Sequence, residues 1–108
     1  MSETVQRGSR NLIVTIVQKG AANSVLEATH KAGVEGGTVI MGEGTADKNR
    51  YLDFFGLEYN PEKDVILTIA QEQLTDKVFE AIVQATKLDK PGQGISFIID
   101  LNNLPVEV

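Results

Sequence analysis

Few side chains in this sequence have the types and spacing that catalysis or metal binding requires. The chain has 1 histidine and 0 cysteines, so it offers no thiolate nucleophile, no disulfide and no thiolate metal ligand. The single imidazole, His30, has no second imidazole or thiol with which to hold a transition metal. Because no nucleophile, base and orienting group occur as a set, we predict no catalytic residues and no metal site.

Aromatic residues gather in one stretch of the chain. The rings of Tyr51, Phe54, Phe55 and Tyr59 lie between positions 51 and 59, among charged residues. If exposed, such rings would anchor a partner protein, since aromatic residues dominate interface hot spots. The alternative is that Phe54 and Phe55 pack back onto the body of the protein. The NPEKD segment that follows predicts a turn before a strand that begins at Val65.

The composition is that of one globular domain. A chain of 108 residues with 42% hydrophobic and 23% charged residues fits a single domain with a modest core. Its net charge of -5 would repel a phosphate backbone, so we expect no nucleic-acid partner. No apolar run reaches the roughly 20 residues of a membrane-spanning helix, and the start MSETVQRGSR lacks the apolar middle of a signal peptide. We therefore expect a cytoplasmic protein without direct membrane insertion.

The two halves of the chain resemble each other. The segment TIVQKGAANSVLEA, which begins at Thr15, aligns with TIAQEQLTDKVFEA, which begins at Thr68, at an offset of 68 − 15 = 53 residues. Threonine, isoleucine, glutamine, valine, glutamate and alanine recur at matching places in both segments. Such self-similarity indicates one supersecondary unit used twice.

Each half has the pattern of a strand, a helix and a second strand. Continuous β-branched and aliphatic residues predict strands over 12–17 and 65–70, and further strands are expected over 38–41 and 95–99. Between them, apolar residues at helical spacing predict one helix in each half, with Gly33 ending the first. The apolar stripes are Val25, Ala28, Thr29 and Ala32 in the first half and Leu74, Val78, Ala81, Ile82 and Ala85 in the second.

Two such units predict an α+β fold of the ferredoxin-like type. This fold is a double βαβ sandwich, with a four-stranded antiparallel sheet and two helices on one face. Residues alternate between the two faces of a strand, and in the first strand both sets are largely apolar: Leu12, Val14 and Ile16 against Ile13, Thr15 and Val17. Helices on one face leave the other uncovered, which predicts an oligomer built on that face. The alternative is that strand ends and the long loop fold over it.

The order of these elements and several short motifs resemble the PII-type nitrogen-regulatory signalling proteins. The motifs are GGTVI at 36–40, GEGT at 42–45 and LDKPGQGISFIID at 88–100. The segment FFGLEYNPEKDVIL is similar to the PII-like branch with a short T-loop. The resemblance, over 11–104, implies a homotrimer with inward-facing sheets. It also implies one domain over 1–108, with a flexible N-terminal arm over 1–10 and a T-loop-like insertion over 44–63.

The resemblance implies a regulator and not an enzyme. Family members bind ATP or ADP in clefts between subunits, and a loop docks onto a protein target such as a membrane transporter or a metabolic enzyme. No cofactor is required, and ATP, ADP or another adenine nucleotide is the implied effector. The loop residues implied in partner contact are Lys48, Arg50, Tyr51, Phe54, Phe55 and Tyr59.

The implied nucleotide site is matched only in part. Its residues here are Thr38, Gly44, Lys90, Gly92 and Gly94. Glycines let the backbone approach phosphates, and lysine supplies charge. At three positions where the family has a basic residue, this chain has Ile95, Val106 and Val108. The position of a further basic residue of the family falls near Asp47. Losing about three cations removes most charge-assisted contacts to a triphosphate, and the two glycines also suit a plain turn before a strand.

Two other interpretations remain open. The chain could be a trimeric scaffold of the CutA or PII-like type that does not sense nucleotides. An acylphosphatase-like enzyme shares the fold, but the segment QKGAANS after the first strand offers Lys19 and Asn23 without the arginine that would cradle a phosphate. Fold alone does not decide among these functions.

Overall fold

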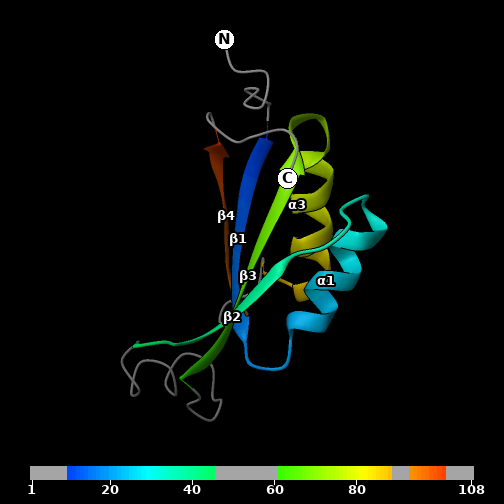
Figure 1. Ribbon diagram of the computed structural model, residues 1–108. Helices are drawn as coiled ribbons and strands as arrows, with labels where there is room; N and C mark the ends of the chain where they lie inside the picture. Colours follow the sequence, from blue (N-terminus) through cyan, green and yellow to red (C-terminus); the bar gives the residue numbers. More distant parts are fainter. Residues whose placement is uncertain (1–9, 46–60, 89–92, 102–108) are drawn as a thin grey trace.

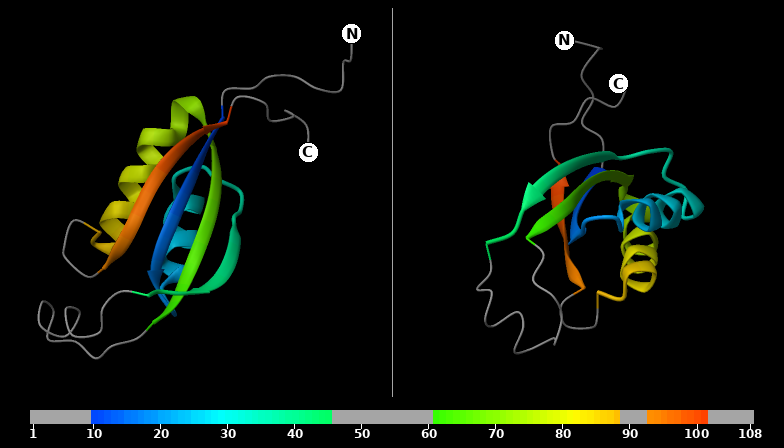
Figure 2. Two further views of the ribbon diagram at one scale, coloured as in Figure 1. Left: turned by 90° about the vertical axis from the view of Figure 1, so that its left-hand side faces the viewer. Right: turned by 90° about the horizontal axis from the view of Figure 1, so that it is seen from below.

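We describe the protein from a computed structural model, which places residues 10–45, 61–88 and 93–101. The elements in chain order are β1 Arg10–Gln18, α1 Ala22–Lys31, β2 Thr38–Glu43, β3 Glu62–Gln71, α3 Glu72–Thr86 and β4 Gly94–Leu101. The strands form one antiparallel sheet in the order β2-β3-β1-β4, and both helices cover the same face of it (Figure 1, Figure 2). The predicted ferredoxin-like double βαβ sandwich is confirmed.

The pairing of the two central strands reflects the internal repeat. In the β1–β3 ladder Val14 lies opposite Leu67, its own equivalent at an offset of 67 − 14 = 53 residues. On either side, Ile13 pairs with Thr68 and Thr15 pairs with Ile66. Because Ile66 is the repeat equivalent of Ile13 and Thr68 that of Thr15, each of these pairs is the equivalent of the other. The two halves are therefore related by a pseudo-twofold axis that passes through the centre of the sheet.

The core lies between the sheet and the two helices. Its fully buried strand residues come from alternate positions of β1 and β3, where side chains point to the helices. The buried hydrophobic residues are Ile13, Val17, Val25, Ala32, Val34, Ile66, Ala70, Val78 and Ile82. Helices α1 and α3 also pack against each other, which closes the layer above the central strands.

The other face of the sheet is apolar, and no helix of residues 10–45, 61–88 and 93–101 lies over it. It carries the alternate positions of every strand, and several of its large side chains are exposed. They include Ile40 (47%), Ile69 (47%), Ile95 (54%), Phe97 (41%) and Ile99 (43%). Between them lie the half-buried side chains of Leu12, Val14, Ile16, Val65 and Leu67. The alternation of β1 and β3 predicted this uncovered apolar face, and we call it the open face.

Helix α1 ends as the sequence predicts. Gly33 adopts a positive φ of 108°, a conformation that glycine tolerates without a steric penalty. The amide of Gly33 donates to the carbonyl of His30 at 3.0 Å, and that of Val34 donates to the carbonyl of Thr29 at 2.9 Å. These bonds satisfy carbonyls that the end of a helix leaves free.

Helix α3 buries a slightly different set of residues from the one expected. Its buried residues are Thr75, Val78 and Ile82, whereas Ala85, which we assigned to the apolar stripe, is exposed. Thr75 can be buried because its hydroxyl donates to the carbonyl of Gln71 at 2.9 Å. The prediction for Ala85 was therefore wrong. The burial of Thr75 was missed because a pattern of apolar residues does not count a threonine whose hydroxyl is satisfied by its own helix.

Two boundaries differ from the sequence interpretation. Arg10, which we included in the N-terminal arm, is the first residue of β1. Strand β3 begins at Glu62 and not at Val65, so the turn expected over NPEKD ends earlier and Lys63 belongs to the strand. The remainder of the proposed arm and most of the proposed loop lie outside the described residues.

Thr15 and Thr68, which are equivalent in the repeat, give a matched test of core packing. Both are fully buried, but the Thr15 hydroxyl lies 3.0 Å from the hydroxyl of Ser96, while the Thr68 hydroxyl has no hydrogen-bond partner among the described residues. Burying an unpaired hydroxyl costs free energy, so Thr68→Val is expected to raise the free energy of unfolding by about 1 kcal/mol.

Urea unfolding at one fixed protein concentration measures this difference. The control is Thr15→Val, which removes a satisfied hydroxyl and leaves Ser96 without this partner, and it should not stabilise the protein. A Thr68→Val variant that is no more stable than the wild type, or a Thr15→Val variant that gains as much, would contradict the assignment.

Candidate functional site

Three of the residues implied in ligand binding, Thr38, Gly44 and Gly94, lie on the two edges of the sheet. Thr38 begins β2 and Gly44 follows its last residue, while Gly94 begins β4. Strands β2 and β4 are the outermost strands, so three strand spacings, about 14 Å, separate Gly94 from the β2 edge. Lys90 and Gly92 lie outside the described residues. One chain therefore does not bring Gly94 to Thr38 and Gly44, whereas two copies could do so by placing a β2 edge beside a β4 edge.

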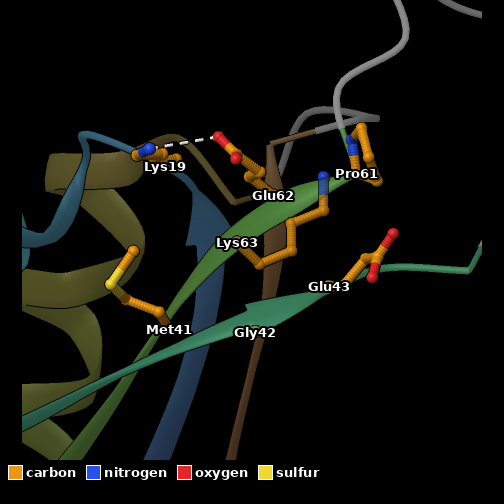
Figure 3. Close-up of a pocket in the computed structure, with 7 residues that line it drawn as sticks. All are labelled: Lys19, Met41, Gly42, Glu43, Pro61, Glu62 and Lys63. Carbon is orange, nitrogen blue, oxygen red and sulfur yellow. Dashed lines mark ion pairs between the residues drawn. The ribbon is translucent and has the colours of Figure 1, made fainter.

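The ends of β2 and β3 form the root of the loop that connects them. The amide of Gly44 donates to the carbonyl of Pro61 at 2.6 Å, which brings the two sides of the loop together. A groove of about 530 Å³ opens here, and its lining residues are Lys19, Met41, Gly42, Glu43, Pro61, Glu62 and Lys63. Figure 3 shows that these residues come from the β1–α1 turn, the end of β2 and the start of β3. We call this feature the loop-root groove.

The charges of the loop-root groove are balanced. Lys19 forms an ion pair with Glu62 at 3.2 Å (Figure 3), and Glu43 is exposed. Partial burial lowers the pKa of Lys63, because desolvation disfavours the charged ammonium. Among the residues that the structure describes, two lysines and two glutamates line the groove. These give it no excess of positive charge, which is a poor match for a triphosphate.

The sequence interpretation missed Lys63 as a lining residue of this groove. It lies opposite Gly42 in the β2–β3 ladder, on the same side of the strand as Val65. Extending the alternation of β3 backwards by one step would have placed it at the loop root. The sequence interpretation missed this position because it assigned NPEKD, which includes Lys63, to a turn and not to a strand.

Gly94 has a structural role that does not depend on a ligand. Its φ is +132°, and a Cβ at this position would collide with the backbone oxygen of Ile16 and approach a side-chain carbon of Leu88 at 3.2 Å. Gly44 differs, because the nearest atom to a Cβ there is the side-chain Cε of Lys63 at 3.0 Å, which can move. Close approach of β4 to β1 therefore requires glycine at 94, which favours the structural alternative for this residue.

Several other predictions can be placed. His30 is exposed at the end of α1. Among residues 10–45, 61–88 and 93–101, no group of three or more His, Cys, Asp or Glu side chains could hold a metal ion. None of the helices in that part of the chain is both long and apolar enough to cross a bilayer. The implied partner-binding residues, Lys48, Arg50, Tyr51, Phe54, Phe55 and Tyr59, lie outside the described residues.

Comparison with known proteins gives a family and a fold. A family model described as nitrogen regulatory protein P-II matches residues 10–106. Among solved structures, the chain is similar to the PII protein of Arabidopsis thaliana bound to citrate, with a TM-score of 0.66 and 19% sequence identity, over 88% of this chain and 79% of that one. At this identity the structural likeness supports the fold alone. A search of curated protein sequences finds no match.

The role of Gly94 can be tested by adding a single methyl group. Gly94→Ala is expected to lower the free energy of unfolding by about 2 kcal/mol or more, because a positive φ penalises an alanine and its Cβ overpacks against β1. Gly36→Ala is the control, since no atom lies within 4 Å of a Cβ at that position.

Thermal and urea unfolding of both variants measure the effect. The control should remain within about 0.5 kcal/mol of the wild type. Equal stability of the two alanine variants would show that Gly94 is not required by the fold.

Proposed function

The chain belongs to the nitrogen regulatory protein P-II family, and we propose that it regulates a partner protein in response to a small effector. Proteins of this family are signalling proteins and not enzymes. The proposed target is a membrane transporter or a metabolic enzyme of nitrogen metabolism, and the proposed location is the cytoplasm. The family match over nearly the whole described chain is the observation that carries this proposal.

We propose that the active form is a homotrimer in which the open faces of three copies meet. Apolar side chains of all four strands support this arrangement, because their exposure to water in a monomer would be unfavourable. Ile69 of β3 and Phe97 of β4, for example, lie on the open face and are 47% and 41% exposed. Contact between copies would remove this surface from water.

The proposed ligand sites are the clefts between neighbouring copies. The β2 edge of one copy would supply Thr38 and Gly44, and the β4 side of the next would supply Lys90, Gly92 and Gly94. Each group is incomplete without the other, because β2 and β4 are the opposite edges of one sheet. We propose an adenine nucleotide as the effector, with contacts from backbone amides more than from side-chain cations.

The proposed mechanism is a change in the population of loop conformations. An effector bound in the cleft favours one conformation of the loop over 45–61, and the partner distinguishes it from the others. Contact with the partner is assigned to Lys48, Arg50, Tyr51, Phe54, Phe55 and Tyr59. The position of Gly44 at the loop root, bonded to Pro61, supports a link between the cleft and the loop.

A second candidate function is supported by the charges of the loop-root groove. Because the two lysines there are balanced by Glu43 and Glu62, the protein could retain the trimeric scaffold without sensing nucleotides. It would then bind its partner constitutively or respond to a different small molecule.

Calorimetric titration with ATP, ADP and cyclic AMP separates the two candidates. Nucleotide sensing predicts saturable heat with a millimolar or tighter dissociation constant, and weaker binding by Gly92→Val, because a side chain there would block the approach of phosphate to the backbone. Absence of heat with all three nucleotides would reject nucleotide sensing and favour the constitutive scaffold.

Two adjacent residues of β4 allow a test of the proposed assembly. Phe97 and Ile98 are 41% and 40% exposed, but Phe97 lies opposite Val14 on the open face, and Ile98 lies opposite Ile13 on the helix side. Phe97→Glu is expected to dissociate the trimer, since it would bury a carboxylate from each copy at one interface.

Light scattering on the purified variants gives their mass. Ile98→Glu, the control, should remain trimeric, because its side chain lies outside the proposed interface. Trimers of both variants, or loss of the trimer in both, would argue against assembly through the open face.

A further inference from the structure

The β1–α1 turn is attached to the root of the loop by three contacts. The amide of Lys19 donates to the carbonyl of Glu62 at 3.3 Å, and the ammonium of Lys19 pairs with the carboxylate of Glu62 at 3.2 Å. The amide of Gly20 donates to Oδ2 of Asp64 at 3.0 Å. These contacts join the turn before α1 to the first residues of β3, which continue directly into the loop.

The contact with Asp64 differs from the ion pair in its burial. Asp64 is 8% exposed and lies between Val17 of β1 and Met41 of β2 in the sheet. The side chains of Lys19 and Glu62 are 49% and 60% exposed. Exposed ion pairs contribute little because water screens them, whereas a hydrogen bond to an ionised and buried carboxylate is stronger than one between neutral groups. Asp64 is therefore the main side-chain attachment of the turn.

The backbone around Gly20 fits this role. Gly20 has a φ of +100°, and no described atom lies within 4 Å of a Cβ built there. A glycine is therefore favoured at this position by the backbone conformation and not by a lack of space for a side chain. The turn instead places the amide of Gly20 where the Asp64 carboxylate can accept from it. A buried carboxylate without such a donor would be costly.

We propose that Asp64 is a positioning residue that couples the β1–α1 turn to the root of the loop. Loss of the Gly20–Asp64 bond would free the adjacent Lys19, whose amide donates to the carbonyl of Glu62. Glu62 follows Pro61, whose carbonyl accepts from the amide of Gly44, so the change would reach the loop root. A partner or effector that rearranges the loop root thereby shifts the start of α1, and a contact at the turn shifts the loop root. This inference deepens the proposed regulatory function, because it names a second surface that senses the state of the loop.

Amide hydrogen exchange, followed by NMR on the full-length protein without any effector, tests the coupling. Asp64→Leu is expected to accelerate exchange at Gly20 by roughly 10- to 100-fold, the effect of losing a hydrogen bond to a charged group. Through the proposed coupling it should also accelerate exchange at Gly44, whose amide is bonded to the carbonyl of Pro61. Asp64→Asn keeps a side-chain acceptor and should restore protection at both amides. Thr75→Val is the control. It removes a buried hydroxyl of α3 that contacts Asn11 at the start of β1, the end of the strand away from the β1–α1 turn, and it should leave both amides protected.

A second variant approaches the coupling from the turn, in case Asp64→Leu does not fold. Gly20→Ala strains the turn through its positive φ without a steric contact, and it should accelerate exchange at Gly44 severalfold. Faster exchange at Gly20 with unchanged exchange at Gly44 would overturn the proposal, as would an Asp64→Asn variant that behaves like Asp64→Leu. Because no nucleotide is present, failure here is distinct from failure of the proposed effector binding.

Discussion

The structure depends on one constraint, which is that the central strands are apolar on both faces while the helices of the described part of the chain cover only one. Residues such as Ile13 and Ile66 are completely buried beneath α1 and α3, whereas Ile69 on the opposite face remains 47% exposed. The pseudo-twofold axis between β1 and β3 places equivalent apolar residues side by side on the open face. Duplication of one βαβ unit therefore produces a continuous apolar surface and not two separate patches.

The order of the strands determines where a ligand could bind. Strands β2 and β4 are the edges of the sheet, so the segments around Gly44 and Gly94 are kept apart within one copy. The proposed site uses both segments and therefore lies between copies, so the proposed sensing requires assembly. The loop root then connects such a site to the rest of the protein, through the Gly44–Pro61 bond on one side and the Gly20–Asp64 bond on the other.

Much of the fold could be predicted from the sequence, because it follows from residue alternation, helical spacing and the internal repeat. The open face could be predicted for the same reason. The burial of Thr75, the exposure of Ala85 and the start of β3 at Glu62 could not, since they depend on how elements pack and on hydrogen bonds within them. The structural role of Gly94 was also hidden, because only the approach of Ile16 shows why a side chain cannot fit. The loop residues inferred to contact a partner remain predictions.

Sedimentation equilibrium of the wild-type protein at micromolar concentration tests the central claim most directly. If the open face must be covered by other copies, the protein will sediment with three times the mass of its 11.7 kDa chain. A species with the mass of one chain at these concentrations would contradict the account, because it would leave the apolar face of the sheet in water.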